Sequence, residues 1–199
     1  MHKKLRLRAI SVYLVVGLFV SGCQSFSSHK AIDTITTHKF ILAENQDIVG
    51  DVATILTNEN DTLSDIARHF GLGFNDISIV NPEIDPWLPE PNSKVILPLR
   101  FLLPDVKREG VVLNLANMRL FYFPEKTSNH VLTYPVGIGR KGWSTPTGVT
   151  KIIEKKKNPV WNVPLSILKE HIKKGDPLPR IVPSGPYNPL GGYAMRLGF

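Results

Sequence analysis

The sequence has 199 residues and an ordinary apolar content, which suits one globular domain with a smaller second one. Its formal net charge is +7, but residues 23–199 alone carry 20 basic and 17 acidic residues, a charge of +3. That excess is too small to indicate a nucleic-acid partner. A single cysteine, Cys23, excludes an intrachain disulfide.

The N-terminus has the pattern of an export signal. Four basic residues within the first eight are followed by an apolar run, Ala9 to Val20, which is short for a membrane span. The run ends at Val20-Ser21-Gly22-Cys23, which resembles the cleavage site of bacterial lipoproteins. This resemblance implies that residues 1–22 are removed and that Cys23 carries the lipid that anchors the chain in a membrane. The alternative is an ordinary signal peptide with a chance cysteine.

Gln24, where some lipoproteins have aspartate, implies by the same resemblance sorting to the periplasmic face of a Gram-negative outer membrane. Residues 23–37 are rich in Ser, Thr and His and lack periodicity, which is typical of a tether. No Cys, Asp or Glu lies at ligand spacing from His29 or His38, so we expect no metal site there.

A strand-helix-helix-strand unit follows the tether. Thr62 precedes a run with apolar residues at helical spacing that ends at Gly71, and Asp65 three residues on gives a capping box. A second helix is predicted from Asn75 to Asn81-Pro82. Flanking strands are predicted at Val52 to Leu56 and Val95 to Pro98.

This unit, residues 38–105, resembles a LysM module through Asp61-Thr62-Leu63, Ile66-Ala67, Phe70-Gly71, Asn81-Pro82 and Leu97-Pro98. LysM modules bind glycans that contain N-acetylglucosamine, such as peptidoglycan. The resemblance implies Asp61, Thr62 and Asn81 as glycan-binding residues. Asn60 stands where the family usually has glycine, and residues 84–92 are longer and richer in proline than usual. The alternative is a module that only serves as a spacer.

From Glu109 onward the pattern is mainly β. Two runs joined through Asn117 predict a tight hairpin, and one helix is predicted between Pro164 and Gly175. The predicted strands are Val111–Leu115, Arg119–Phe123, His130–Val136, Val149–Ile153 and Ala194–Leu197. Short strands with Pro- and Gly-rich connections favour a sheet or sandwich, so the fold class is α+β overall, a βααβ module followed by a mainly-β domain.

Two motifs in this region match known signatures without the context that they need. Gly137–Gly142 fits G-x-G-x-x-G, but Pro146 and Gly148 stand where a phosphate-binding helix would begin, so a glycine-rich turn is predicted. Ser166–Lys169 fits the S-x-x-K of serine acyltransferases, but no K-T-G or S-D-N accompanies it. The sequence therefore predicts no cofactor.

Five blocks occur in the order that L,D-transpeptidase catalytic domains of the YkuD type have. They are Pro135–Gly139, Thr145–Gly148, Asn158-Pro159-x-Trp161, Gly175-Asp176-x-Leu178-Pro179 and Gly185-Pro186-x-Asn188-Pro189-Leu190-Gly191. Residues 106–199 are identified by resemblance as such a domain, a β-sandwich. The residues expected along its substrate groove are Thr145, Pro146, Thr147, Gly148, Asn188 and Gly191.

The resemblance implies a periplasmic enzyme that transfers acyl groups between peptidoglycan stem peptides, or onto a wall-anchored lipoprotein, through a cysteine thiolate activated by histidine. The family's His and Cys motifs would fall beyond Phe199. We therefore expect a catalytic domain that is incomplete at its C-terminus and a chain without catalytic residues of its own. The alternative function is a non-enzymatic outer-membrane lipoprotein that binds peptidoglycan.

Overall fold

The computed structural model describes residues 35–127 and 129–198. The predicted signal peptide, Cys23 and most of the tether lie outside these residues. The chain divides into two compact units, an N-terminal unit that ends at Gly137 and a C-terminal unit, Ile138–Phe199. The predicted boundary at 105/106 is a different division and stays a prediction. Within the described ranges, no helix has both the length and the apolar character to cross a bilayer.

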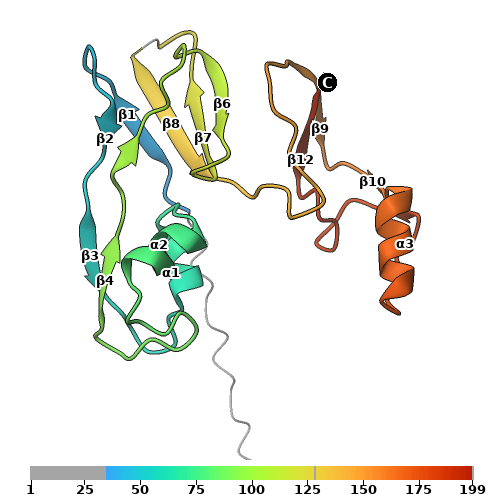
Figure 1. The fold of residues 1–199 in the computed structure, drawn as a ribbon, viewed down its shortest axis with the longest axis horizontal. Helices are drawn as coiled ribbons and strands as arrows, with labels where there is room; N and C mark the ends of the chain where they lie inside the picture. The colour runs from blue at the N-terminus through green and yellow to red at the C-terminus, as the bar shows by residue number, and fades with distance from the viewer. Residues whose placement is uncertain (1–34, 128, 199) are drawn as a thin grey trace, which may run out of the picture. The chain divides into compact units, whose positions relative to one another are not determined.

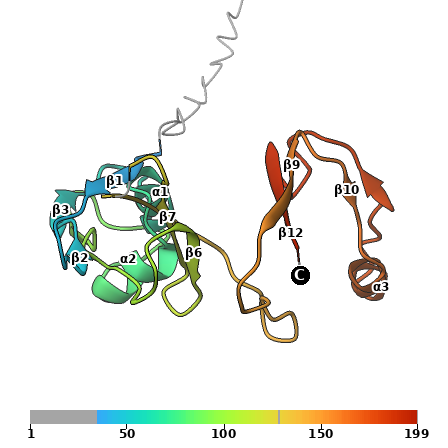
Figure 2. The same ribbon diagram turned by 90° about the horizontal axis from the view of Figure 1, so that it is seen from above.

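The N-terminal unit combines a four-stranded antiparallel sheet of order β1-β8-β7-β6 with two helices and two short strand pairs, β2-β5 and β3-β4 (Figures 1 and 2). Its elements are β1 His38–Ile41, β2 Ile48–Val49, β3 Ala53–Leu56, α1 Leu63–His69, α2 Phe74–Val80, β4 Lys94–Leu97, β5 Phe101–Leu102, β6 Gly110–Asn114, β7 Arg119–Phe123 and β8 His130–Pro135.

The predicted βααβ order is present as β3-α1-α2-β4. The hydroxyl of Thr62 accepts a hydrogen bond from the backbone N–H of Asp65 at 3.0 Å, as the capping pattern predicts. Gly71 ends the first helix with φ +58°. Asn60 has φ +66°, a left-handed conformation that favours glycine and that asparagine tolerates better than most residues. Asparagine at this position is therefore compatible with the backbone conformation.

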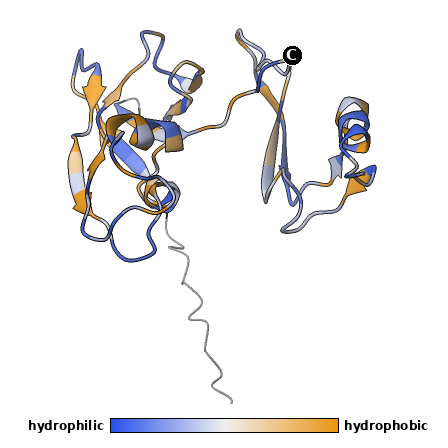
Figure 3. Cartoon of the chain, turned by 60° about the horizontal axis from the view of Figure 1, so that its bottom comes forward, coloured by the Kyte–Doolittle hydropathy of each residue, from blue (hydrophilic) through white to orange (hydrophobic). Residues whose placement is uncertain are grey.

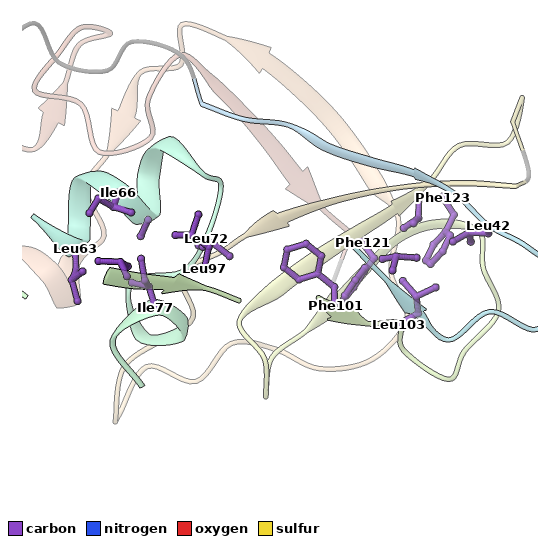
Figure 4. Packing of buried hydrophobic residues seen from close by; sticks show 14 residues of the cluster. Leu42, Leu63, Ile66, Leu72, Ile77, Leu97, Phe101, Leu103, Phe121 and Phe123 are labelled. Carbon is purple, nitrogen blue, oxygen red and sulfur yellow. The ribbon is translucent and has the colours of Figure 1, made fainter. Parts of the chain in front are cut away.

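One hydrophobic core runs through the N-terminal unit (Figure 4). Leu63 and Ile77 of the two helices are fully buried, as are Phe121 and Val131 of the sheet. The hairpin β6-β7 has the predicted position, and its turn places Met118 at φ +45°. β1 pairs with β8, with Phe40 opposite Val131, although about 90 residues separate them. β1 therefore forms one edge of the sheet, and β6 of the hairpin forms the other.

Three donors from the sheet side hold the carbonyl groups at the C-terminal end of α1. The N–H of Thr36 donates to the carbonyl of His69 at 2.9 Å, and Nε2 of His38 lies 2.6 Å from the carbonyl oxygen of Phe70. Nη2 of Arg119 donates to the carbonyl of Gly71 at 3.0 Å. These carbonyls lack partners within the helix and carry partial negative charge, so N–H donors and a cation suit them.

Arg119 is buried although it carries a charge. Its guanidinium lies 3.9 Å from the centre of the Phe101 ring, and its Nε and Nη1 atoms are buried without a hydrogen-bond partner among the described residues. Burial lowers the pKa of Arg119 to about 10, and the negative charge of Asp76 partly opposes that shift. Arg119 is in phase with Phe121 and Phe123 on the buried face of β7.

The C-terminal unit contains β9 Ile152–Lys157, β10 Trp161–Asn162, α3 Leu165–Lys173, β11 Ile181–Val182 and β12 Tyr193–Leu197. Its strands form two antiparallel pairs, β12-β9 and β10-β11. Its only buried residues among those described are Pro159, Val163 and Asn188. The predicted strand Val149–Ile153 was wrong in position, because β9 extends instead through three exposed lysines that carry no apolar signal. The described chain as a whole is mainly β with few helices.

We predict that replacing Arg119 by alanine lowers the free energy of unfolding by about 2–4 kcal/mol, because the change leaves a cavity and an unpartnered carbonyl at Gly71. Methionine fills most of the same space without burying a charge, so Arg119→Met should lower the free energy of unfolding by less than Arg119→Ala does. Urea unfolding of both variants measures the difference. Equal losses would show that packing by this side chain is unimportant.

Candidate functional site

The predicted groove segment Thr145–Gly148 belongs to a loop that closes on itself. The backbone N–H of Gly139 donates to the hydroxyl of Thr145 at 2.7 Å, and the N–H of Trp143 donates to the carbonyl of Arg140 at 2.8 Å. Thr145 is partly buried, whereas Pro146, Thr147 and Gly148 are exposed. The hydroxyl oxygen of Thr145 therefore accepts a hydrogen bond within the loop, and the three residues after it are exposed.

Gly139 is necessary for this closure. A Cβ atom at this position would lie 1.8 Å from the carbonyl oxygen of Trp143 and 2.9 Å from the backbone nitrogen of Thr145. No helix follows the loop, and the next regular element is β9, which begins at Ile152. The G-x-G-x-x-G motif is thus a glycine-rich turn, as predicted, in which Gly139 lies close to the backbone of Trp143 and Thr145. It is not followed by the helix that a dinucleotide site requires.

Asn188 connects two of the five sequence blocks. It is only 5% exposed. Its Nδ2 donates to the carbonyl groups of Pro159 at 2.9 Å, Pro183 at 3.1 Å and Val182 at 3.3 Å, and its Oδ1 accepts the N–H of Leu190 at 2.9 Å. The amide thus binds the Asn158–Trp161 block to the Gly185–Gly191 block. This geometry gives Asn188 a positioning role, because both ends of its amide are used within the protein.

Backbone contacts strengthen the same connection. The N–H of Asn158 donates to the carbonyl of Gly192 at 2.8 Å, and the N–H of Gly191 donates to the carbonyl of Asn188 at 3.0 Å. Asn158 and Gly191 have φ of +49° and +68°. Gly191 is therefore where the block turns in a conformation that favours glycine, and its contribution to the candidate site is to backbone geometry.

A charged cluster joins the glycine-rich loop to α3. Arg140 and Lys174 both pair with the carboxylate of Glu170. The hydrogen bonds from Arg140 and then Lys174 lower the pKa of Glu170 to about 2. A carboxylate with a lowered pKa stabilises the folded state above its ordinary pKa, and this contribution is lost as the pH falls toward 2. The contact is solvent-exposed, so it orients the loop more than it stabilises the unit.

The predicted glycan-binding residues also have partners within the fold. Oδ2 of Asp61 accepts from the backbone N–H of Asn58 at 2.7 Å, and Thr62 caps α1. The buried amide of Asn81 donates to the carbonyls of Ile77 and Ile96 and accepts the N–H of Ile96 at 2.7 Å. Asn81 thus connects α2 to β4. The glycan role of these three residues stays a prediction.

Residue-by-residue reasoning from the sequence did not single out Arg119. It lines a cavity of about 380 Å³ in the N-terminal unit. Asn75, Asp76, Phe101 and Met118 are among its other lining residues. The period-2 pattern of β7, in which Arg119 shares a face with Phe121 and Phe123, is the signal that could have identified a buried cation.

The described residues do not include Cys23, and they contain no group of three or more His, Cys, Asp or Glu residues that could hold a metal ion. Nδ1 of His171, a half-buried residue of α3, lies 3.2 Å from Oδ2 of Asp176. The Ser166–Lys169 motif occupies the first half of that helix. The site consists of the loop that contains Gly139 and Thr145 and of the two sequence blocks that Asn188 joins. Both can shape a binding surface.

Residues 108–195 match the YkuD family, described as the L,D-transpeptidase catalytic domain. This stretch runs from β6 to β12 and contains all five sequence blocks. The structural class of the described chain, mainly β with few helices, is consistent with such a domain. Residues 108–195 are therefore similar to an L,D-transpeptidase catalytic domain.

Several similar proteins are named as probable L,D-transpeptidases. Probable L,D-transpeptidase ErfK/SrfK of Salmonella typhimurium strain LT2 is 40% identical over 158 residues, 78% of this chain and 51% of that protein. Probable L,D-transpeptidase YcfS of Escherichia coli K12 is 40% identical over 72% of this chain and 45% of its own length. Probable L,D-transpeptidase YbiS of the same strain is 34% identical over 100% of this chain and 61% of its own length. This chain spans about half the length of the relatives that it matches.

A solved structure from Brucella melitensis, described as a probable carnitine operon oxidoreductase, is similar over 48% of this chain and 57% of that chain. The identity is 23% and the TM-score 0.39. This likeness is too weak to support a conclusion about fold or function.

We predict that Asn188→Ala lowers the free energy of unfolding of the C-terminal unit by about 2–3 kcal/mol, because several carbonyl groups lose their donor. Asn162, which is exposed in the same unit, provides the control variant Asn162→Ala. Hydrogen exchange at the Leu190 amide measures the change. If both variants exchange alike, Asn188 does not hold the two blocks together.

Proposed function

We propose that residues 108–195 contribute the substrate-groove side of a periplasmic L,D-transpeptidase that acts on peptidoglycan. The observation that carries this proposal is the family match over these residues, together with homologues named as probable L,D-transpeptidases. The close turn at Gly139 and the Asn188 connection support it, because they give the matched blocks defined shapes. We expect Pro146, Thr147 and Gly148 to contact the stem peptide and Asn188 and Gly191 to position the wall of the groove.

The reaction that we propose is acyl transfer with a covalent intermediate. A thiolate attacks the peptide carbonyl after the third residue of a tetrapeptide stem, and D-alanine leaves as its amine takes a proton from a histidine. A second amine, from another stem or from a wall-anchored lipoprotein, then attacks the thioester and releases the thiol. We assign neither the thiol nor the histidine of this reaction to a residue that the structure describes.

A chimaera tests this proposal. Residues 108–195 of this chain would replace the matching stretch of YbiS, and D-alanine release from disaccharide tetrapeptide would be followed by mass spectrometry. We expect the rate of D-alanine release to lie within about tenfold of that of YbiS, because contacts that hold the ground state and the transition state equally well leave kcat unchanged. Gly139→Val in the chimaera should abolish activity, because its side chain collides with the Trp143 carbonyl. A folded but inactive chimaera, beside active YbiS, would contradict the proposal.

The alternative, a non-enzymatic peptidoglycan-binding lipoprotein, has one observation in its favour. The hydrophobic core of the described residues lies in the N-terminal unit, which also contains the whole βααβ module. This unit therefore has what a binding module needs to be stable on its own. If the 199-residue chain is retained on purified sacculi and the chimaera is inactive, the non-enzymatic binding function is favoured.

We further propose that Cys23 carries lipid and that the protein sits on the periplasmic face of the outer membrane. Cys23→Ser should abolish incorporation of labelled palmitate and remove the protein from the outer-membrane fraction, because several acyl chains are needed for stable anchoring. Gln24→Asp is the matched control, which should keep the label and move to the inner membrane. Undiminished labelling of Cys23→Ser would contradict the proposal.

A further inference from the structure

The βααβ module lies between two parts of one sheet along the chain. β1 precedes the module and β6, β7 and β8 follow it, yet β1 pairs with β8 in a single sheet of order β1-β8-β7-β6 (Figure 2). Both the helices of the module and the strands of the sheet carry hydrophobic residues (Figure 3), and those that are buried form one core. The module is therefore an insertion within the sheet, connected to it at both of its ends.

Arg119 of β7 contacts the module through its buried side chain. Its Nη2 donates to the carbonyl of Gly71 at 3.0 Å, just after α1, and the residue is only 3% exposed. Its guanidinium lies 3.9 Å from the centre of the Phe101 ring, and Asp76 of α2 lines the same cavity. A charged donor to a buried carbonyl makes one of the stronger kinds of hydrogen bond. The C-terminal end of α1 therefore has a fixed place relative to β7.

The backbone beside Arg119 holds the end of β8. Arg119 stands opposite Pro135, the last residue of β8, and the N–H of Val136 donates to the carbonyl of Met118 at 2.9 Å. Because proline has no N–H, Val136 is the next residue along the chain that can donate here. The end of β8 lies in the N-terminal unit and is also the start of the Pro135–Gly139 block. Arg119 thus connects the module to the point where this block begins.

We propose that Arg119 is a positioning residue that sets where the Pro135–Gly139 block begins relative to the βααβ module. Its side chain fixes the end of α1, and its strand fixes the end of β8, so a displacement of one end is felt at the other. A module on a flexible tether would leave the distance between these two points variable. Here the contacts hold both points in one compact unit.

This role deepens the proposed transpeptidase function and rests on it for its meaning in catalysis. A molecule bound to the module would be held at a fixed place relative to the first block of the matched segment. Binding to the module would also stabilise the end of β8, because a ligand that binds only the folded form stabilises the whole cooperative unit. The contacts of Arg119 with α1 and β8 do not themselves depend on the reaction.

Native-state hydrogen exchange tests the positioning role in the chain from Gln24 onward, which keeps every described residue and removes the apolar leader. The amide of Leu72 reports on the end of α1, and the amide of Val136 reports on the end of β8. The amide of Leu42, which donates to the carbonyl of Asn129 at the opposite end of β8, is the internal reference. Local opening of each end changes the exchange of its own amide.

Arg119→Met removes the donor to the Gly71 carbonyl and keeps most of the side-chain volume. We expect it to speed the exchange of Leu72 and Val136 at least about tenfold relative to Leu42, because a buried carbonyl loses a charged donor. Arg119→Lys keeps a charged donor and should hold both amides within about threefold of the unmodified chain.

The matched control is Val163→Ala, at a buried position of the C-terminal unit, which should leave all three amides unchanged. If Arg119→Met does not fold, Asp76→Asn replaces it, because it removes negative charge beside the guanidinium and should speed exchange at Val136 more than at Leu42. Faster exchange at the module amide alone, equal changes at the two ends of β8, or no rescue by lysine would overturn the proposal. An inactive chimaera would not change these results, because exchange is measured without substrate.

Discussion

The C-terminal end of α1 is the point on which the arrangement of the N-terminal unit depends. Helix ends leave carbonyl groups without partners, and here three consecutive ones, at His69, Phe70 and Gly71, are taken by Thr36, His38 and Arg119. The donors come from β1 or just before it and from β7, two strands of the sheet that are far apart in sequence. The helical module is thereby fixed to the sheet by directional contacts in addition to the shared apolar core.

Buried side-chain amides perform a similar task in each unit. Asn81 bridges α2 and β4, and Asn188 bridges two proline-rich blocks that form little regular structure. An amide can donate and accept at once, so it satisfies backbone groups on both sides without burying a charge. In the C-terminal unit, where only three described residues are buried, such contacts replace much of what a core would do. The matched blocks owe their shape to these amides and to glycine.

The sequence predicted elements well where the signal is local. The caps and apolar spacing of α1, α2 and α3 and the Asn117 hairpin located those elements to within a residue or two. It did not predict β1, β2, β5, β10 or β11, which are two to four residues long and are defined by partners distant in the chain. β9 was misplaced because its lysines carry no apolar period. The motifs included Asn188 and Gly139. Their roles depend on which backbone atoms lie close to them in the folded chain, and the spacing of residues in the sequence does not show this.

The two units differ in net charge, which is −5 for residues 35–137 (8 basic, 13 acidic) and +8 for residues 138–199 (11 basic, 3 acidic). Cations that are exposed and unpaired gain little from the fold, so their concentration in the C-terminal unit is not explained by stability. The same unit has fewer buried residues than the N-terminal unit, and several large apolar side chains of β9, α3 and β12 are exposed. The family match extends over residues 138–195 of this unit, so the shape of the matched blocks there depends more on hydrogen bonds and backbone turns than on a buried core.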